Sequence, residues 1–245
     1  MNLEKIGEGK TATIVRSGET AIKLFINTPS FVAEHEASCQ QFAYDAGLPV
    51  PAVLDVRMLD HGNMALHMQY IDGKPLIVPG MDKDERRYAI HTLVKLQCMV
   101  HRVNGQGLPN QTDLLAQKIR RVTFLDVAMK ANLLDRLMRA DTGSQNLCHG
   151  DFHPQNILFD GKKHWIIDWV DATAGNPLVD ACRTYLIFKQ YMLRSSGIYL
   201  QMFCKESGAN KEDVLAWLPM IAAARLNENL NNKERAKLIE FIISR

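Results

Sequence analysis

Two adjoining stretches decide the fold: LCHGDFHPQN at residues 147–156 and WIIDW at residues 165–169. They contain Asp151, an asparagine five residues later at Asn156, and a second aspartate at Asp168. The apolar residues 157–159 and 166–167 predict two short strands that pin these polar side chains into the core. Phosphoryl transfer needs a carboxylate at the acceptor hydroxyl and a divalent metal at the phosphates. Magnesium prefers hard oxygen ligands, so an amide carbonyl and a carboxylate suit it.

Two other interpretations of this motif stay open. Asp151 and Asn156 could simply cap turns, where both residue types are common. His149, Asp151 and His153 have the H-x-D-x-H spacing of a transition-metal site. Neither interpretation explains why Asn156 and Asp168 stand where they do beside two apolar strand candidates, so the motif favours phosphoryl transfer.

The string H-G-D-x-x-x-x-N followed by I-D-W resembles the aminoglycoside phosphotransferase and choline kinase group, and the resemblance extends over nearly the whole chain. It implies an α+β, two-lobed protein-kinase-like fold, with a small β-rich lobe holding one helix and a larger helical lobe. It also implies Asp151 as catalytic base and Asn156 and Asp168 as magnesium ligands. Asp180 resembles the carboxylate that braces the catalytic loop from a helix start. His149 is expected to be structural, with its ring bonded to backbone near Asp168.

Residues 6–12, IGEGKTA, predict a turn ahead of two strands. Gly7 and Gly9 would let backbone amides approach nucleotide phosphates, although Ala12 stands where a third glycine is expected. The triplet GKT also imitates the end of a P-loop. That motif requires glycine at position 4, which is Glu4, and a following helix, whereas β-branched runs predict strands here.

Lys23 lies in a predicted strand at residues 21–26 and matches the kinase-like lysine that contacts the α- and β-phosphates. Taken alone, it could equally be a solvated edge-strand lysine. The next helix, expected from Pro29 and Ser30 to about Gly47, decides between them. Its Glu36 shares a stripe at spacings of three and four with Val32, Ala33, Cys39 and Ala43.

A carboxylate on an apolar stripe requires a nearby cation, so Glu36 is the expected partner of Lys23 and both are expected at the nucleotide. Glu34, on another face of the helix, is the second candidate. Farther along, residues 68–73 resemble the hinge that binds adenine through backbone groups, with Gln69 and Ile71 as the contributors. The expected lobes are residues 1–71 and 72–245, with the hinge at about 69–75.

Further elements follow from turn and capping signals. Two more strands are expected at residues 52–58 and 63–71. Asp82 with Glu85 predicts a capping box that opens a helix to about Arg102. Two helical segments are expected within 112–140, a strand-like passage at 146–168, and helices thereafter. Late helix starts are expected at Asn210 with Asp213 and at Asn231 with Glu234.

Composition narrows the partners. The chain has 245 residues and a formal net charge of +2, which argues against nucleic acid or an anionic membrane as main partner. No run of about 18 apolar residues is present. The N-terminal sequence lacks the apolar core of a signal peptide, so a cytoplasmic location is expected. The five cysteines form no C-x-x-C pair and are expected to be reduced and packed as small apolar residues.

The expected reaction moves the γ-phosphate of ATP or GTP, with Mg²⁺, to a hydroxyl of an amino sugar, aminoglycoside or amino alcohol. From residue 176 onward seven acidic residues face ten basic ones, which gives no support to a polycationic acceptor. A Ser/Thr protein kinase is an alternative, but residues 169–175 are too short for a peptide-docking segment. The second alternative is a non-catalytic nucleotide-binding pseudokinase. The sequence does not decide the acceptor or the oligomeric state.

Overall fold

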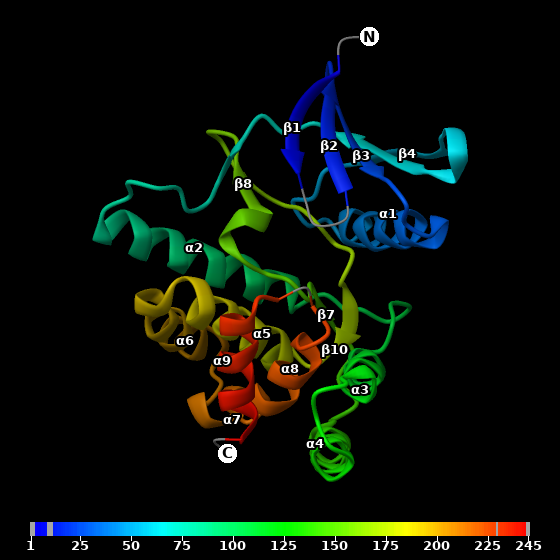
Figure 1. Ribbon diagram of the computed structural model, residues 1–245. Coiled ribbons are helices and arrows are strands. Elements are labelled where there is room, and N and C mark those ends of the chain that lie inside the picture. The colour runs from blue at the N-terminus through cyan, green and yellow to red at the C-terminus, as the bar shows by residue number, and fades with distance from the viewer. Residues whose placement is uncertain (1–2, 9–11, 229, 244–245) are drawn as a thin grey trace. The chain divides into compact units, whose positions relative to one another are not determined.

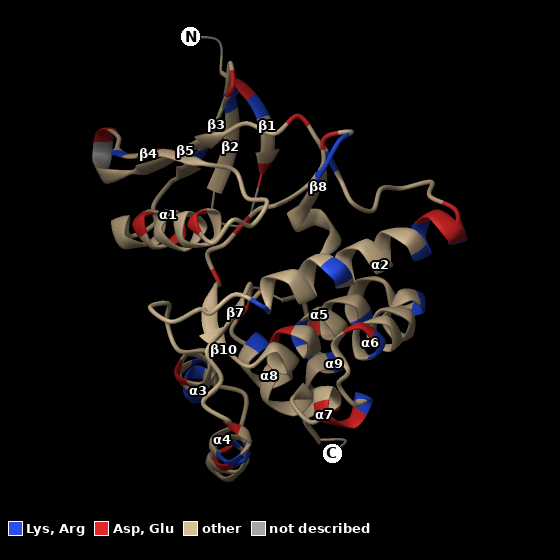
Figure 2. Ribbon diagram, turned by 180° about the vertical axis from the view of Figure 1, so that it is seen from behind, with Lys and Arg blue, Asp and Glu red and all other residues tan. Residues whose placement is uncertain are grey.

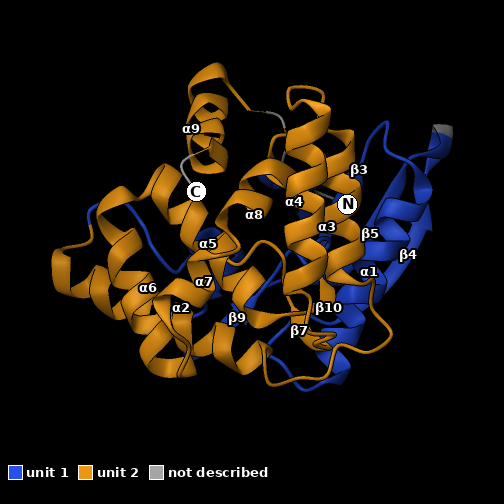
Figure 3. Cartoon of the chain, turned by 90° about the horizontal axis from the view of Figure 1, so that it is seen from below, with its two compact units in different colours: residues 1–80, 154–171 blue, residues 81–153, 172–245 orange. Residues whose placement is uncertain are grey.

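The computed structural model describes residues 3–8, 12–228 and 230–243 of the chain, the His61 side chain excepted (Figure 1). The chain divides into two compact units, coloured separately in Figure 3. Unit 1 comprises Met1–Gly80 and Pro154–Asp171, and unit 2 comprises Met81–His153 and Ala172–Arg245. Each unit has its own core and is described by itself.

Unit 1 is built on an antiparallel sheet of five strands in the order β1-β2-β3-β5-β4. The strands are β1 (Glu4–Glu8), β2 (Ala12–Ser17), β3 (Thr20–Phe25), β4 (Val53–Met58) and β5 (Met64–Gln69). The three-residue 3-10 turn η1 (Asp60–Gly62) connects β4 to β5. Successive side chains of a strand point to opposite faces, so each strand has one set of residues available for the core.

The helix α1 (Ser30–Asp45) covers one face of this sheet (Figure 1). Its Ala33 and Ala37 pack in one cluster with Phe25, Met64 and Leu66 of the sheet. Small residues on the helix allow close approach to the strands, where Phe25 and Leu66 are almost completely buried. The helix ends two residues before Gly47, whose left-handed backbone (φ 78°) suits glycine.

A three-stranded sheet completes unit 1, with order β6-β8-β9. Its strands are β6 (Lys74–Pro75), β8 (Ile157–Phe159) and β9 (His164–Ile166), and the 3-10 turn η2 (Pro154–Asn156) precedes β8. Leu76 N–H donates to the carbonyl of Ile157 at 2.8 Å, and Ile166 N–H donates to the carbonyl of Pro49 at 2.8 Å. These bonds join residues 154–171 to unit 1, so the compact units differ from the expected lobes 1–71 and 72–245.

Unit 2 consists of helices and one two-stranded sheet. The helices are α2 (Lys83–Val100), α3 (Gln111–Arg121), α4 (Val127–Ala140), α5 (Pro177–Tyr191), α6 (Leu193–Ser207), α7 (Lys211–Leu215), α8 (Leu218–Arg225) and α9 (Asn232–Ile243). The sheet pairs β7 (Asn146–Cys148) with β10 (Thr173–Gly175) in antiparallel register. A stacked cluster of buried aromatic rings, Phe188, Tyr199 and Phe203, ties α5 to α6.

The capping signals in the sequence correspond to real helix starts. The Asp82 side chain accepts from the N–H groups of Asp84 and Glu85, and the Glu85 carboxylate accepts from Asp82 N–H, which is a complete capping box. Asn231 and Glu234 make the same reciprocal arrangement at the start of α9. At α7 the Asn210 side chain donates to Asp213 instead and caps no backbone group.

The expected glycine turn at residues 6–12 is different in the structure. Gly7 is a strand residue of β1 that pairs with Ile14 of β2 beside a register shift. Residues 6–8 and Ala12 of the expected turn therefore belong to strands, and residues 9–11, which include Gly9, lie outside the described residues. A strand, β2, and no helix follows at Ala12, as the argument against a P-loop required.

Charged residues of both signs are interspersed on the helices of unit 2 (Figure 2). Within the described ranges of the chain, no helix is both long and apolar enough to cross a bilayer.

Replacing Asp82 with alanine removes the side-chain half of the capping box at α2. We expect the free energy of unfolding to fall by about 1 kcal/mol, because two N–H groups lose their acceptor. Urea denaturation followed by circular dichroism measures this loss. Asp84→Ala is the control: it removes an acidic residue from the same turn without removing the cap, and should cost only about 0.3 kcal/mol. Equal losses in the two variants would contradict the assignment.

Candidate active site

In unit 1 a buried lysine joins two carboxylates that are distant in sequence. Lys23 Nζ of β3 lies 2.6 and 2.8 Å from the two carboxylate oxygens of Glu36 on α1. It also lies 2.9 Å from Oδ1 of Asp168, 145 residues away. The Lys23 side chain is 12% exposed and that of Glu36 only 2%. The apolar stripe of α1 thus carries its one acid to the sheet lysine, whereas Glu34 is exposed.

The electrostatics of this cluster follow from its burial. Burial alone would lower the pKa of Lys23, but the nearby carboxylates of Glu36 and Asp168 outweigh it and raise the pKa. The amine therefore stays charged. Burial raises the pKa of Glu36, against the opposing effect of Lys23. A buried acid of this kind is tolerable only with a cation at hydrogen-bonding distance.

Asp168 lies two residues after the end of β9. Its backbone is left-handed (φ 66°), which non-glycine residues rarely adopt and which carries strain. The preceding Ile167 donates its N–H to the carbonyl of Asn156 at 3.0 Å, so the two predicted metal ligands belong to adjacent segments. With this backbone conformation, the Asp168 carboxylate points toward Lys23.

Asn156 and Asp168 form a donor set that suits magnesium. Asn156 is the last residue of η2 and is 7% exposed, whereas the Asp168 side chain is 38% exposed. An amide oxygen and a carboxylate are hard ligands, which Mg²⁺ prefers to nitrogen or sulfur. In the part of the chain that is described, no group of three or more His, Cys, Asp and Glu side chains is arranged to hold a metal. The alternative metal site would need His149, Asp151 and His153 to form a group of this kind, and they do not.

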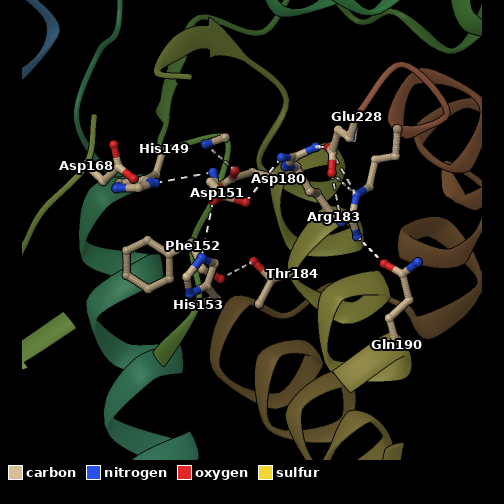
Figure 4. Close-up of polar contacts among 12 residues, drawn as sticks. His149, Asp151, Phe152, His153, Asp168, Asp180, Arg183, Thr184, Gln190 and Glu228 are labelled. Carbon is tan, nitrogen blue, oxygen red and sulfur yellow. Dashed lines mark hydrogen bonds and ion pairs between the residues drawn. The ribbon is translucent and has the colours of Figure 1, made fainter. Parts of the chain in front are cut away.

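In unit 2 the turn after β7 presents Asp151 (Figure 4). Its Oδ1 accepts from Nη2 of Arg183 at 3.1 Å, and its Oδ2 lies 3.2 Å from Nε2 of His153. Its own N–H donates to Nδ1 of His149 at 3.2 Å, which fixes the ring as an acceptor there. Gly150, with φ 83°, makes the sharp turn that precedes it.

Asp151 is held in its ionised form. Burial alone would raise the pKa of its carboxyl group, but the hydrogen bond from His153 and the charge of Arg183 lower the pKa well below its usual range. A carboxylate of such low pKa is a weak base. It is well suited to accepting a hydrogen bond from a hydroxyl group and fixing its direction.

Asp180 holds this turn from inside the unit. It is 1% exposed and lies in the first turn of α5. Its Oδ1 accepts the N–H of Gly150 at 2.8 Å, and its Oδ2 accepts from Nε2 of His101 at 2.9 Å and from Nε2 of Gln97 at 3.2 Å. Burial alone would raise the pKa of Asp180, but the hydrogen bond and the electrostatic attraction of His101 outweigh burial and lower this pKa.

One face of α5 contacts three consecutive residues of the turn. Asp180 bonds to the N–H of Gly150, Arg183 to the carboxylate of Asp151, and Thr184 Oγ1 donates to the carbonyl of Phe152 at 2.8 Å. Positions i, i+3 and i+4 of a helix lie on the same side, which is why a single helix can do this. The turn is therefore held by α5 in addition to its own Gly150 and His149.

The other predicted nucleotide-binding positions lie at strand ends of unit 1. Gln69 ends β5, and its N–H donates to the carbonyl of Ala52 at 2.9 Å. The carbonyl of Ile71 accepts from Gly73 N–H at 3.0 Å. Gly7 lies in β1, where an added Cβ would meet Ile14 only at ordinary contact distance. Contact of these residues with a nucleotide remains a prediction.

The sequence analysis missed Arg183 as a partner of Asp151, and it missed Glu228, which bonds to Arg183. For Arg183 a signal existed: it follows Asp180 by three residues and so shares its helix face. No local pattern marks Glu228, which lies 45 residues beyond Arg183.

A small antiparallel sheet with a lysine–glutamate pair, a helical unit with the H-G-D turn, and the asparagine that completes the H-G-D-x-x-x-x-N motif define a phosphotransferase of the protein-kinase-like fold. The chain belongs to the phosphotransferase enzyme family, whose sequence profile matches residues 27–218.

Comparison with known proteins agrees with the fold. A thermostable mutant of aminoglycoside phosphotransferase APH(4)-Ia superposes with a TM-score of 0.69 at 18% identity, covering 99% of this chain and 92% of that one. A choline/ethanolamine kinase family protein from Mesorhizobium loti also gives 0.69 at 18% identity, covering 100% and 89%. Acyl-CoA dehydrogenase family member 11 of Homo sapiens and of Pongo abelii is 24% identical over 180 residues, which is 63% of this chain. The match spans 23% of the length of these curated relatives.

Replacing Asp180 with asparagine tests the buried contact that holds the turn. The pKa of Asp180 is lowered in the folded chain, so its stabilising effect is present above the ordinary carboxyl pKa of about 4 and fades as the pH falls. We expect Asp180→Asn to lose about 3 kcal/mol at pH 7 and less at pH 3, measured by denaturant unfolding at each pH. Asp135→Asn, at an exposed position of α4, should show no such trend. A loss that is independent of pH would contradict the ionised assignment.

Proposed function

We propose that this chain transfers the γ-phosphate of ATP, or of GTP, to a hydroxyl group of a small molecule. The observation that carries the proposal is the cluster in which Lys23 binds both Glu36 and Asp168. Two of the solved relatives were captured with nucleotides, one with ADP and hygromycin B and one with GDP. These complexes support a nucleotide site of the same kind here, for either an adenine or a guanine base.

Lys23 is the candidate ligand for the α- and β-phosphates, and Glu36 keeps its amine charged and directed. Asn156 and Asp168 would hold Mg²⁺, which neutralises phosphate oxygens when bound. The backbone of Gln69 and Ile71 is the candidate site for the base, and Gly7 and Gly9 are candidate contacts to the phosphates. Each role rests on the position of the residue in the fold and on the family's chemistry.

Asp151 is proposed to orient the acceptor hydroxyl. The hydroxyl oxygen attacks the γ-phosphorus, the bond from that phosphorus to the bridging oxygen of the β-phosphate breaks, and the hydroxyl proton passes to Asp151. The products are a phosphate ester, a nucleoside diphosphate and a proton. Because phosphoryl transfer has a loose transition state, the proton leaves late and a weakly basic carboxylate suffices. The low pKa of Asp151 agrees with such a role.

A small acceptor fits better than a protein substrate. Only residues 169–175 separate Asp168 from the N-cap of α5, and residues 173–175 of this segment form β10, which pairs with β7. Trp169 is fully buried. A segment so short and so largely structured offers little surface on which a peptide could dock.

The charges beside Asp151 bear on the acceptor. Glu228 is an acid close to Asp151, and it is bonded to both Arg183 and Arg225. An acid neutralised in this way offers little attraction to a polycation. The structure therefore favours an acceptor with few positive charges over a polycationic aminoglycoside.

Replacing Asp151 with asparagine should reduce kcat by about a hundred-fold or more, because the hydroxyl loses its orienting and proton-accepting group. Transfer is measured as nucleotide consumption with a panel of sugars, amino sugars, amino alcohols and aminoglycosides. The nucleotide-induced rise in Tm should persist in the variant.

Asp135→Asn serves as the matched control for this substitution and should keep its full rate. An Asp151→Asn variant with an unchanged rate would remove Asp151 from the mechanism. A nucleotide-induced shift with no turnover in the wild type would instead indicate a binding protein, and phosphate incorporated into added protein would indicate a protein kinase.

Replacing Lys23 with methionine should weaken nucleotide binding, because the buried amine that faces the phosphates is lost. At a nucleotide concentration of about 100 times the wild-type Kd, we expect the rise in Tm to fall by about half, corresponding to roughly ten-fold weaker binding. Lys205→Met, at an exposed position of α6, should leave the shift intact. An undiminished shift in Lys23→Met would place the nucleotide elsewhere.

A further inference from the structure

A carboxylate near the C-terminal end of the chain connects to Asp151 through an arginine. The Arg183 guanidinium is a fork: Nη1 lies 2.9 Å from Oε1 of Glu228, and Nη2 lies 3.1 Å from Oδ1 of Asp151 (Figure 4). The guanidinium is planar and rigid, so the position of one nitrogen sets that of the other. The carboxylate that holds Nη1 thereby sets the direction from which Nη2 approaches Asp151.

The Glu228 carboxylate is held by a second arginine, Arg225, in addition to Arg183. Nε of Arg225 lies 3.1 Å from both of its carboxylate oxygens, and Nη2 of Arg225 lies 2.9 Å from Oε2. The N–H of Glu228 also donates to the carbonyl of Arg225 at 2.9 Å. Arg225 is 5% exposed at its side chain and bonds to Gln190 of α5. The carboxylate is thus anchored on the end of α8.

The cluster is electrically balanced. Two acids, Asp151 and Glu228, alternate with two arginines, Arg183 and Arg225. Burial alone would raise the pKa of Glu228, but Arg183 and Arg225 lower it to about 2, so the carboxylate is charged at neutral pH. Without that charge, Arg183 and Arg225 would lose the carboxylate that they share, and both the position of Arg183 and the field at Asp151 would change.

We propose that Glu228 is a positioning residue for Asp151, acting by fixing the Arg183 guanidinium against the Asp151 carboxylate. The inference rests on the proposed role of Asp151 in phosphoryl transfer. It adds a residue that lies beyond residues 27–218, the region matched by the family profile. It also assigns a role in the chemistry to the segment after α8, which lies far from Asp151 along the chain.

Kinetics of the full chain give the first test. Glu228→Gln should lower kcat by about ten-fold while leaving KM for the nucleotide unchanged, because Glu228 acts on the carboxylate and not on the nucleotide. Glu228→Asp, which keeps the charge, should recover part of the loss. Glu234→Gln is the control: its carboxylate belongs to the same C-terminal segment and also bonds to α5, but at Tyr191. That variant should retain the wild-type kcat.

A double-mutant cycle separates positioning from general stabilisation. If Glu228 acts through Arg183, adding Glu228→Gln to an Arg183→Gln variant should lower kcat by no more than about two-fold further. Losses that multiply, a nucleotide KM that rises with an unchanged kcat, or an unchanged rate in Glu228→Gln would each overturn the inference.

A second cycle needs no activity and so separates this inference from the proposed function. The effects of Asp151→Asn and Glu228→Gln on the free energy of unfolding should be non-additive in the wild type and additive in Arg183→Gln. If the two effects on the free energy of unfolding are additive in both backgrounds, Glu228 does not act on Asp151 through Arg183, whatever the kinetics show. A wild type that transfers no phosphate to any acceptor overturns the proposed function, and the unfolding cycle still decides whether Glu228 acts on Asp151.

Discussion

The candidate site in unit 2 depends on the requirement that a buried carboxylate be fully hydrogen-bonded. Asp180 is almost completely buried and meets that requirement with Gln97 and His101 of the α2 region and with the N–H of Gly150. None of these donors can move away without leaving a charge unsatisfied in the interior. The turn that carries Asp151 therefore takes its shape from the needs of a neighbouring acid.

In unit 1 a lysine is shared between two carboxylates that differ in burial. Lys23 is shared between Glu36, which is 2% exposed, and Asp168, whose side chain is 38% exposed. The buried contact has no water to replace it, whereas the contact to Asp168 can be exchanged at lower cost. Glu36 thus serves as the permanent partner of the lysine. Under the proposed function, Asp168 is the partner whose place at Lys23 a phosphate would take.

Much of this could be predicted from spacing. Glu36 on an apolar stripe required a cation and found Lys23, and Asp82 with Glu85 capped α2, because both signals are local patterns with one physical solution. Where pairing with distant segments intervened, local signals failed. Gly7 became a strand residue through β2, and residues 154–171 joined unit 1 through bonds to β6 and Pro49.

The sequence by itself determined the family, the capped helix starts, and the Lys23, Glu36 and Asp151 chemistry of the site, since periodicity, caps and the H-G-D-x-x-x-x-N motif are all contained within short stretches. Only the tertiary structure decided which cation meets which anion. Arg183 shares a helix face with Asp180, but Glu228 reaches it across 45 residues, and Asp168 reaches Lys23 across 145. Contacts at such separations are set by the packing of whole helices and strands, because two side chains far apart in the sequence carry no mutual pattern that would mark them as partners.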